Sequence, residues 1–109
     1  MSVMDTAKID GMGIDGDTLV LMVSDHFTWV IGGEEHLKMY QNKLNSYIRF
    51  IDEKGYCGYY RNKNFSSFRI VIYTKYPAPD YFSVFLDSAK DKLDKKNISI
   101  TVERVKEDE

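Results

Sequence analysis

Four short segments with hydrophobic residues predict four β-strands, and in the last two of them hydrophobic and polar positions alternate. The segments cover residues 9–14, 18–24, 68–76 and 98–103. In the third segment, Phe68, Ile70, Ile72 and Tyr76 fall on one side, and Arg69, Val71, Tyr73 and Lys75 fall on the other. A half-buried strand shows this period of two. Asp15-Gly16-Asp17 separates the first two segments and is typical of a tight hairpin turn.

Two longer segments carry hydrophobic residues at helical spacing instead. The first runs from Glu34 to about Glu53, and its stripe consists of Leu37, Tyr40, Leu44, Tyr47, Ile48 and Ile51. The second runs from Pro79 to about Lys96, and its stripe consists of Phe82, Phe85, Leu86, Ala89 and Leu93. We expect Gly55 to end the first helix and Asn97 to cap the second in a left-handed conformation.

The order ββαβαβ predicts an α+β fold of two layers, with two helices packed on one face of a four-stranded sheet. Residues 1–105 are expected to form one domain, and residues 106–109 an acidic disordered tail. The other face of the sheet would carry a mixture that includes Val20, Met22, Val71 and Tyr73. A mixed open face suits a partner protein or a homodimer. The order of the strands in the sheet stays open.

The composition narrows the class of protein further. A hydrophobic fraction of 43% is that of a globular domain and excludes a disordered chain. Cys57 is the only cysteine, so neither an internal disulfide nor a thiolate metal cluster is expected. No apolar run approaches the roughly 20 residues that cross a membrane, and the N-terminus lacks a signal-peptide pattern. We therefore expect a cytoplasmic protein without a membrane partner.

Charge is distributed unevenly along the chain, although the net charge is only −2. Residues 1–36 contain seven acidic residues and one lysine, whereas residues 54–79 contain five basic residues and no acidic one. The small net charge disfavours nucleic acid as a partner. The uneven distribution favours a charged protein partner.

Several pieces of the sequence, read in order, resemble one family. They are Ile9-Asp10-Gly11-Met12-Gly13-Ile14-Asp15, Val23-Ser24-Asp25-His26 with Trp29, Glu34-Glu35-His36-Leu37, and Gln41-Asn42-Lys43-Leu44-Asn45. Over nearly its whole length the chain resembles a family of small bacterial proteins classed as a domain of unknown function. The resemblance implies a bacterial or phage origin and no established activity, and it supplies no catalytic residues. Val30-Ile31-Gly32-Gly33 departs from the more acidic link expected there.

One candidate site lies where the second strand ends and the first helix begins. Asp25, His26 and His36 could bind a transition metal, because two imidazoles and a carboxylate are common ligands of zinc and iron. Glu34 and Glu35 lie beside them in the sequence. The spacing matches no established metal motif. The alternative is structural, with Asp25 capping backbone donors and the glutamates suiting the positive end of the helix dipole.

A second candidate is a segment rich in aromatic and basic residues, which we call the aromatic-basic segment (residues 56–69). Tyr59, Tyr60, Arg61, Lys63 and Arg69 are its candidate binding residues. Rings beside cations bind single-stranded RNA. Tyr and Arg are also the residues that dominate protein interfaces. The remaining alternative is a plain loop whose Phe65 and Phe68 fill the core.

These observations favour a non-enzymatic protein-interaction module without a cofactor. An immunity or inhibitor protein, which neutralises a bacterial toxin or defence protein, is the specific form we expect. Its acidic face would consist of Asp15, Asp17, Asp25, Glu34 and Glu35. The alternatives are a metal-dependent enzyme or small-ligand binder at Asp25, His26 and His36, and a weak RNA binder.

Overall fold

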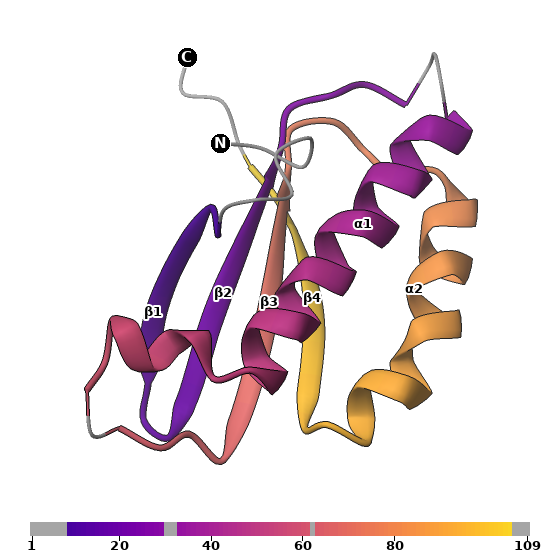
Figure 1. The fold of residues 1–109 in the computed structure, drawn as a ribbon. Helices are drawn as coiled ribbons and strands as arrows, with labels where there is room; N and C mark the ends of the chain where they lie inside the picture. The colour runs from indigo at the N-terminus through magenta and orange to yellow at the C-terminus, as the bar shows by residue number, and fades with distance from the viewer. Residues whose placement is uncertain (1–8, 30–32, 62, 106–109) are drawn as a thin grey trace.

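The fold is one hairpin followed by two helical crossovers (Figure 1). The structure is a computed structural model, and it describes residues 9–29, 33–61 and 63–105. The predicted acidic tail at residues 106–109 lies outside these residues, as does most of the Val30–Gly33 link. Within the described ranges, no helix has the length and apolar character needed to cross a membrane.

The elements follow the predicted order ββαβαβ, which confirms the α+β fold. They are β1 (Gly11–Asp15), β2 (Thr18–Asp25), α1 (Gly33–Asp52), the 3₁₀ helix η1 (Gly55–Gly58), β3 (Ser67–Thr74), α2 (Asp80–Asp94) and β4 (Ile98–Arg104). The sequence pattern did not predict η1, which lies inside the aromatic-basic segment.

The strands form a mixed sheet in the order β1-β2-β3-β4. β1 and β2 are antiparallel, whereas β2, β3 and β4 run parallel to one another. Each helix connects two neighbouring parallel strands, and both connections cross in the same direction along the sheet. Both helices therefore cover one face, as Figure 1 shows. The two-layer prediction is confirmed.

The core lies between the helices and the alternate residues of the strands. The register aligns Leu21, Ile70 and Ile100 in one row across β2, β3 and β4. Tyr40, Leu44, Tyr47 and Ile51 of α1 pack on this surface, together with Phe82 and Leu93 of α2. The strand residues between them, such as Arg69 and Tyr73, point to the face that the helices leave open.

The ends of the elements depend on three residues with positive φ. Gly16 (φ 61°) forms the predicted hairpin turn, and Asn97 (φ 60°) has the predicted left-handed conformation, but it lies in the turn before β4 because Lys95 is the C-cap of α2. α1 ends differently from the prediction, because Lys54 rather than Gly55 adopts the left-handed conformation (φ 54°). Gly55 is required for space instead, since a Cβ atom there would lie 2.6 Å from the ring of Phe50.

Candidate functional site

A buried polar cluster surrounds Asp25, the last residue of β2. The Asp25 side chain points toward the helices because it shares a face with Leu21 and Val23, and it is 1% exposed. Its Oδ2 atom accepts hydrogen bonds from the Tyr40 hydroxyl and from His36 Nε2, the latter at 2.7 Å. Its Oδ1 atom accepts the backbone N–H of Phe27 at 3.0 Å. These three donors satisfy the carboxylate, which therefore needs no metal ion or ligand to compensate its burial.

The ring of His36 is enclosed by other aromatic side chains. It stacks on Trp29 with the ring centroids 3.7 Å apart, and on Tyr40 at 5.5 Å. His36 Nδ1 and Trp29 Nε1 are buried without a hydrogen-bond partner. Burial raises the pKa of the Tyr40 hydroxyl far above its ordinary value, and the nearby carboxylate of Asp25 raises it further. Because His36 and Tyr40 both bond to Asp25, the cluster holds the start of α1 against the end of β2.

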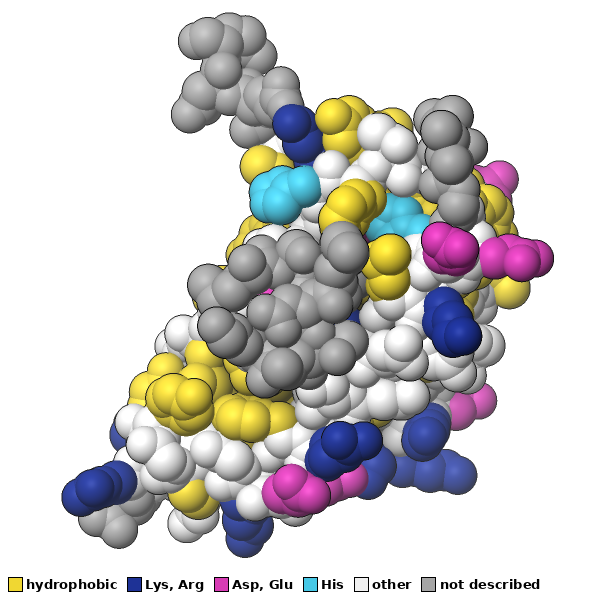
Figure 2. Space-filling view, turned by 45° about the horizontal axis from the view of Figure 1, so that its top comes forward, with side chains coloured by type: hydrophobic (Ala, Val, Ile, Leu, Met, Phe, Trp, Pro, Cys, Tyr) yellow, Lys and Arg dark blue, Asp and Glu magenta, His cyan; other side chains and the backbone are white. Residues whose placement is uncertain are grey.

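His26 does not join this cluster. Its side chain is exposed, whereas His36 is buried. Figure 2 shows the two histidines as separate cyan patches with hydrophobic side chains between them. Across residues 9–29, 33–61 and 63–105, no three His, Cys, Asp or Glu side chains form a group able to hold a metal ion. The structure thus joins Asp25 and His36 but leaves His26 apart from them.

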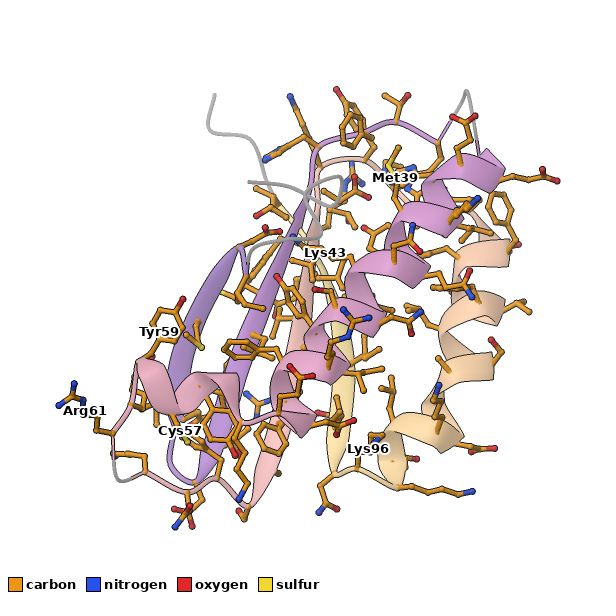
Figure 3. The ribbon with its side chains drawn as sticks, viewed as in Figure 1. Met39, Lys43, Cys57, Tyr59, Arg61 and Lys96 are labelled. Carbon is orange, nitrogen blue, oxygen red and sulfur yellow. The ribbon has the colours of Figure 1, made fainter. Side chains whose placement is uncertain are left out.

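A second buried polar cluster lies one helical turn further along α1, and the sequence reasoning missed it. Lys43 is fully buried and pairs with Asp10, with 2.9 Å between Nζ and Oδ1. Asp10 Oδ2 also accepts the backbone N–H of Ser24 at 3.0 Å. Figure 3 shows Lys43 between α1 and the sheet. The signal was present, because Lys43 falls between Tyr40 and Tyr47 on the helical stripe.

Tyr47 completes this second cluster. Its hydroxyl donates to the backbone carbonyl of Met22 and accepts the backbone N–H of Asp10 at 2.9 Å. Burial raises the pKa of the Tyr47 hydroxyl above its ordinary value of 10. Both clusters are internal and fully hydrogen-bonded around their carboxylates, so they position α1 and do not form an open site.

The acidic residues predicted to form one face are divided by the structure. Asp15 and Asp17 are exposed at the β1–β2 turn, and Glu34 and Glu35 are exposed in the first turn of α1. These groups lie at opposite ends of the eight-residue strand β2, which separates them by roughly 25 Å at about 3.3 Å per residue. Asp25 is buried between the layers and is not part of any surface.

The aromatic-basic segment is anchored by rings on its inner side. Tyr56 in η1 is 5% exposed and contacts Phe50, Phe65 and Phe68, with ring centroids 5.3 to 6.4 Å apart. Tyr60 is half-buried and meets Phe65 edge to face at 6.0 Å. Ser66 N–H donates to the carbonyl of Asp17 at 3.0 Å, which ties the segment to the β1–β2 turn. The segment is therefore a packed part of the domain rather than a loose loop.

The outer side of the same segment is polar and exposed. Tyr59 is 69% exposed, and Arg61, Lys63 and Asn64 line an open depression together with Cys57. Figure 3 shows Tyr59 and Arg61 at the end of the molecule away from α2. Of the five predicted binding residues, Tyr59, Arg61 and Lys63 are exposed here. Tyr60 instead packs inward, and Arg69 faces Asp15 at 3.4 Å.

The comparison with known proteins places the chain in a family but assigns no activity. Residues 1–106 match the model of a family of unknown function, DUF6572. Neither a curated protein nor a solved structure matches the chain. The resemblance to a family of unknown function is therefore confirmed, over nearly the whole sequence. The chain belongs to the family of unknown function DUF6572.

Proposed function

We propose that this protein is a non-enzymatic interaction module that binds a partner protein through the aromatic-basic segment. One observation carries the proposal: Tyr56, Phe65 and Phe68 fix the segment from inside while Tyr59, Arg61 and Lys63 remain exposed outside. A surface held by packed rings on its inner side loses less conformational entropy on binding than a free loop does. Tyrosine and arginine are the side chains most often found at the energetic centre of protein interfaces.

The charge of the segment defines the kind of partner. Within residues 56–69, Arg61, Lys63 and Arg69 are basic and no residue is acidic. Arg69 faces Asp15, whereas the ion pairs found among the described residues include neither Arg61 nor Lys63. An acidic protein surface would complement these cations, and complementary charge raises the association rate and fixes the orientation of the partners. RNA carries the same sign of charge as an acidic protein surface, but a net charge of −2 gives the chain no overall field that attracts a polyanion, so we favour a protein.

The inhibitor or immunity role requires a different surface from the one the sequence indicated. A basic toxin would need a continuous acidic face, and Asp15 and Asp17 lie far from Glu34 and Glu35. A partner neutralised by this protein would therefore present an acidic surface to the aromatic-basic segment. The metal-dependent alternative lacks a comparable observation, because His26 lies apart from Asp25 and His36.

The single cysteine allows a direct experiment. Cys57 is exposed and lies within the segment, so a maleimide-benzophenone probe labels this position alone. Irradiation in lysate of the native host, followed by mass spectrometry, is expected to capture one dominant protein. A matched probe is placed on α2 by combining Cys57→Ser with Ser88→Cys, since Ser88 is also exposed. The same protein is not expected from that position.

Two further conditions separate the possible outcomes. Nuclease treatment of the lysate is expected to leave the capture unchanged; loss of the product would instead show that RNA mediates it. Equal capture from Cys57 and from the α2 position would contradict a binding surface at the aromatic-basic segment.

A further inference from the structure

The outer strand β4 has an unpaired edge. Among the described strands, β4 pairs only with β3, in an unbroken parallel register from Ile98 to Arg104. Natural proteins usually protect such an edge with proline, lysine, a bulge or a very short strand. β4 has seven residues, contains neither proline nor lysine, and carries its two charged residues, Glu103 and Arg104, only at its C-terminal end. No strand of the described residues pairs with its other side, so the backbone donors and acceptors there can pair with another strand.

A groove lies beside this edge, between α2 and β4, and has a volume of about 340 Å³. Its apolar lining consists of Leu86, Leu93, Ile98 and Ile100. Its polar lining consists of Ser83, Asp87, Lys90 and Asp94 of α2 and Ser99 of β4. Val102 continues the apolar row of β4 and is 43% exposed. A strand added to this edge would therefore gain backbone hydrogen bonds and cover apolar side chains at the same time.

We propose that the occupant of this edge is β4 of a second copy of the chain, paired antiparallel about a two-fold axis at Ile100. The residues of β4 alternate so that this register is self-complementary. Ile98 lies opposite Val102 of the second copy, and Ile100 lies opposite Ile100, all on the side of the helices. Ser99 lies opposite Thr101 of the second copy on the open face, which pairs two hydroxyl side chains.

The charges on α2 match the same arrangement. Asp87, Lys90 and Asp94 of α2 line the groove together with Ile100 of β4. A two-fold axis through Ile100 reverses the direction of α2, so that Asp87 of each chain comes to the side of Lys90 of the other. Two equivalent oppositely charged contacts result from one symmetry operation, as in an isologous interface. An unrelated strand would have no reason to match both the apolar row and these charges.

This surface differs from the two discussed above. The sequence analysis expected a homodimer through the open face of the sheet, whereas the edge of β4 lies at its side. The aromatic-basic segment lies beside the β1–β2 turn, at the other edge of the sheet in Figure 1. Dimerisation would leave both aromatic-basic segments free, so the two proposals stand or fall separately.

Site-directed disulfide formation tests the register. Two single-cysteine proteins are prepared in the Cys57→Ser background, one with Ser99→Cys and one with Thr101→Cys. Residues directly opposite each other on antiparallel strands have Cα atoms about 4.5 to 5.5 Å apart, which a disulfide can span. Diagonal neighbours are about 7 to 8 Å apart, which it spans poorly. Oxidised glutathione is therefore expected to produce a covalent dimer from the mixture and little from either protein alone.

Sedimentation velocity of the unmodified protein tests the association itself. A concentration-dependent dimer is expected, and Val102→Lys is expected to weaken it at least tenfold by placing a cation opposite Ile98. Val84→Lys is the control, because Val84 is 67% exposed on α2 and does not line the groove. A protein that stays monomeric at about 0.5 mM would overturn the proposal. So would a dimer that Val102→Lys leaves intact and that yields no mixed disulfide.

Discussion

At the scale of single residues, the side chains that matter most for stability are polar groups on the buried face of α1. Lys43 and Asp10 form an ion pair in which both side chains are at most 2% exposed. Replacing Lys43 alone by methionine leaves a buried carboxylate without its cation, which typically costs about 3–5 kcal/mol. Combining Lys43→Met with Asp10→Asn is expected to recover part of that loss. Urea unfolding of the unmodified protein and of these two variants measures the difference, and equal losses in the single and double variants would contradict a paired role.

The buried tyrosines predict how stability depends on pH. Because the pKa of Tyr47 is raised in the folded protein, the unfolded chain releases its phenolic proton first, near pH 10. The stabilisation is complete below pH 10 and is lost as the pH rises above it. Tyr47→Phe removes the ionisable hydroxyl. The fall in unfolding free energy between pH 10 and 11.5 should therefore become shallower by up to about 1.4 kcal/mol per pH unit.

The matched control for this measurement is Tyr59→Phe. Tyr59 is 69% exposed, so its hydroxyl is solvated in the folded and the unfolded chain alike. Because this replacement removes an exposed hydroxyl instead of a buried one, the alkaline slopes of both variants are compared with that of the unmodified protein. A Tyr47→Phe variant with that same slope would show that Tyr47 is not shielded from solvent.

The sequence could have identified some of these residues but not their partners. Lys43 stands at a stripe position of α1, and a charge there indicates a buried pair. Nothing in the spacing names Asp10 as its partner, because the two residues are 33 positions apart and meet only after β1 joins the sheet. The prediction that Asp25 belongs to an acidic face is wrong, because it used only the number of acidic residues in this part of the chain. Asp25 shares a strand face with Leu21 and Val23, and this pattern indicates a buried side chain.

At the scale of elements, the junction between α1 and η1 controls the shape of the aromatic-basic segment. Gly55→Ala would place a Cβ atom 2.6 Å from the Phe50 ring, which itself contacts Tyr56 and Tyr59. The ring must move, so we expect a loss of about 1–3 kcal/mol in unfolding free energy. Gly58→Ala in the same 3₁₀ helix meets nothing within 4 Å and should change stability by less than about 0.5 kcal/mol. Thermal unfolding compares the two, and similar values would refute the steric argument.

The elements themselves follow from local patterns, with one informative exception. The apolar run of β2, the alternation in β3 and the stripes of α1 and α2 placed each of these elements within about two residues of its observed ends. η1 was not predictable, because its four residues, Gly55 to Gly58, carry no periodic signal. Its conformation depends on the contacts of Tyr56 with rings that come from α1 and from the approach to β3.

At the scale of the whole molecule, charge that is adjacent in sequence is not adjacent in space. The acidic residues of the N-terminal third lie in two groups at opposite ends of β2, and Asp15 of the first group faces Arg69. The basic residues Arg61 and Lys63, in contrast, stay together at one end of the molecule. Strand order, which the sequence left open, decides this outcome by placing the β1–β2 turn beside the aromatic-basic segment.

The measurement that tests the proposed function most directly is the retention of the captured partner by surface variants. Tyr59→Ala combined with Arg61→Ala removes one exposed ring and one cation, and it should reduce retention at least tenfold without changing stability by more than about 0.5 kcal/mol. Val84→Ala combined with Lys92→Ala makes a comparable change on α2 and should retain the partner fully. Equal retention by both variants would contradict binding through the aromatic-basic segment.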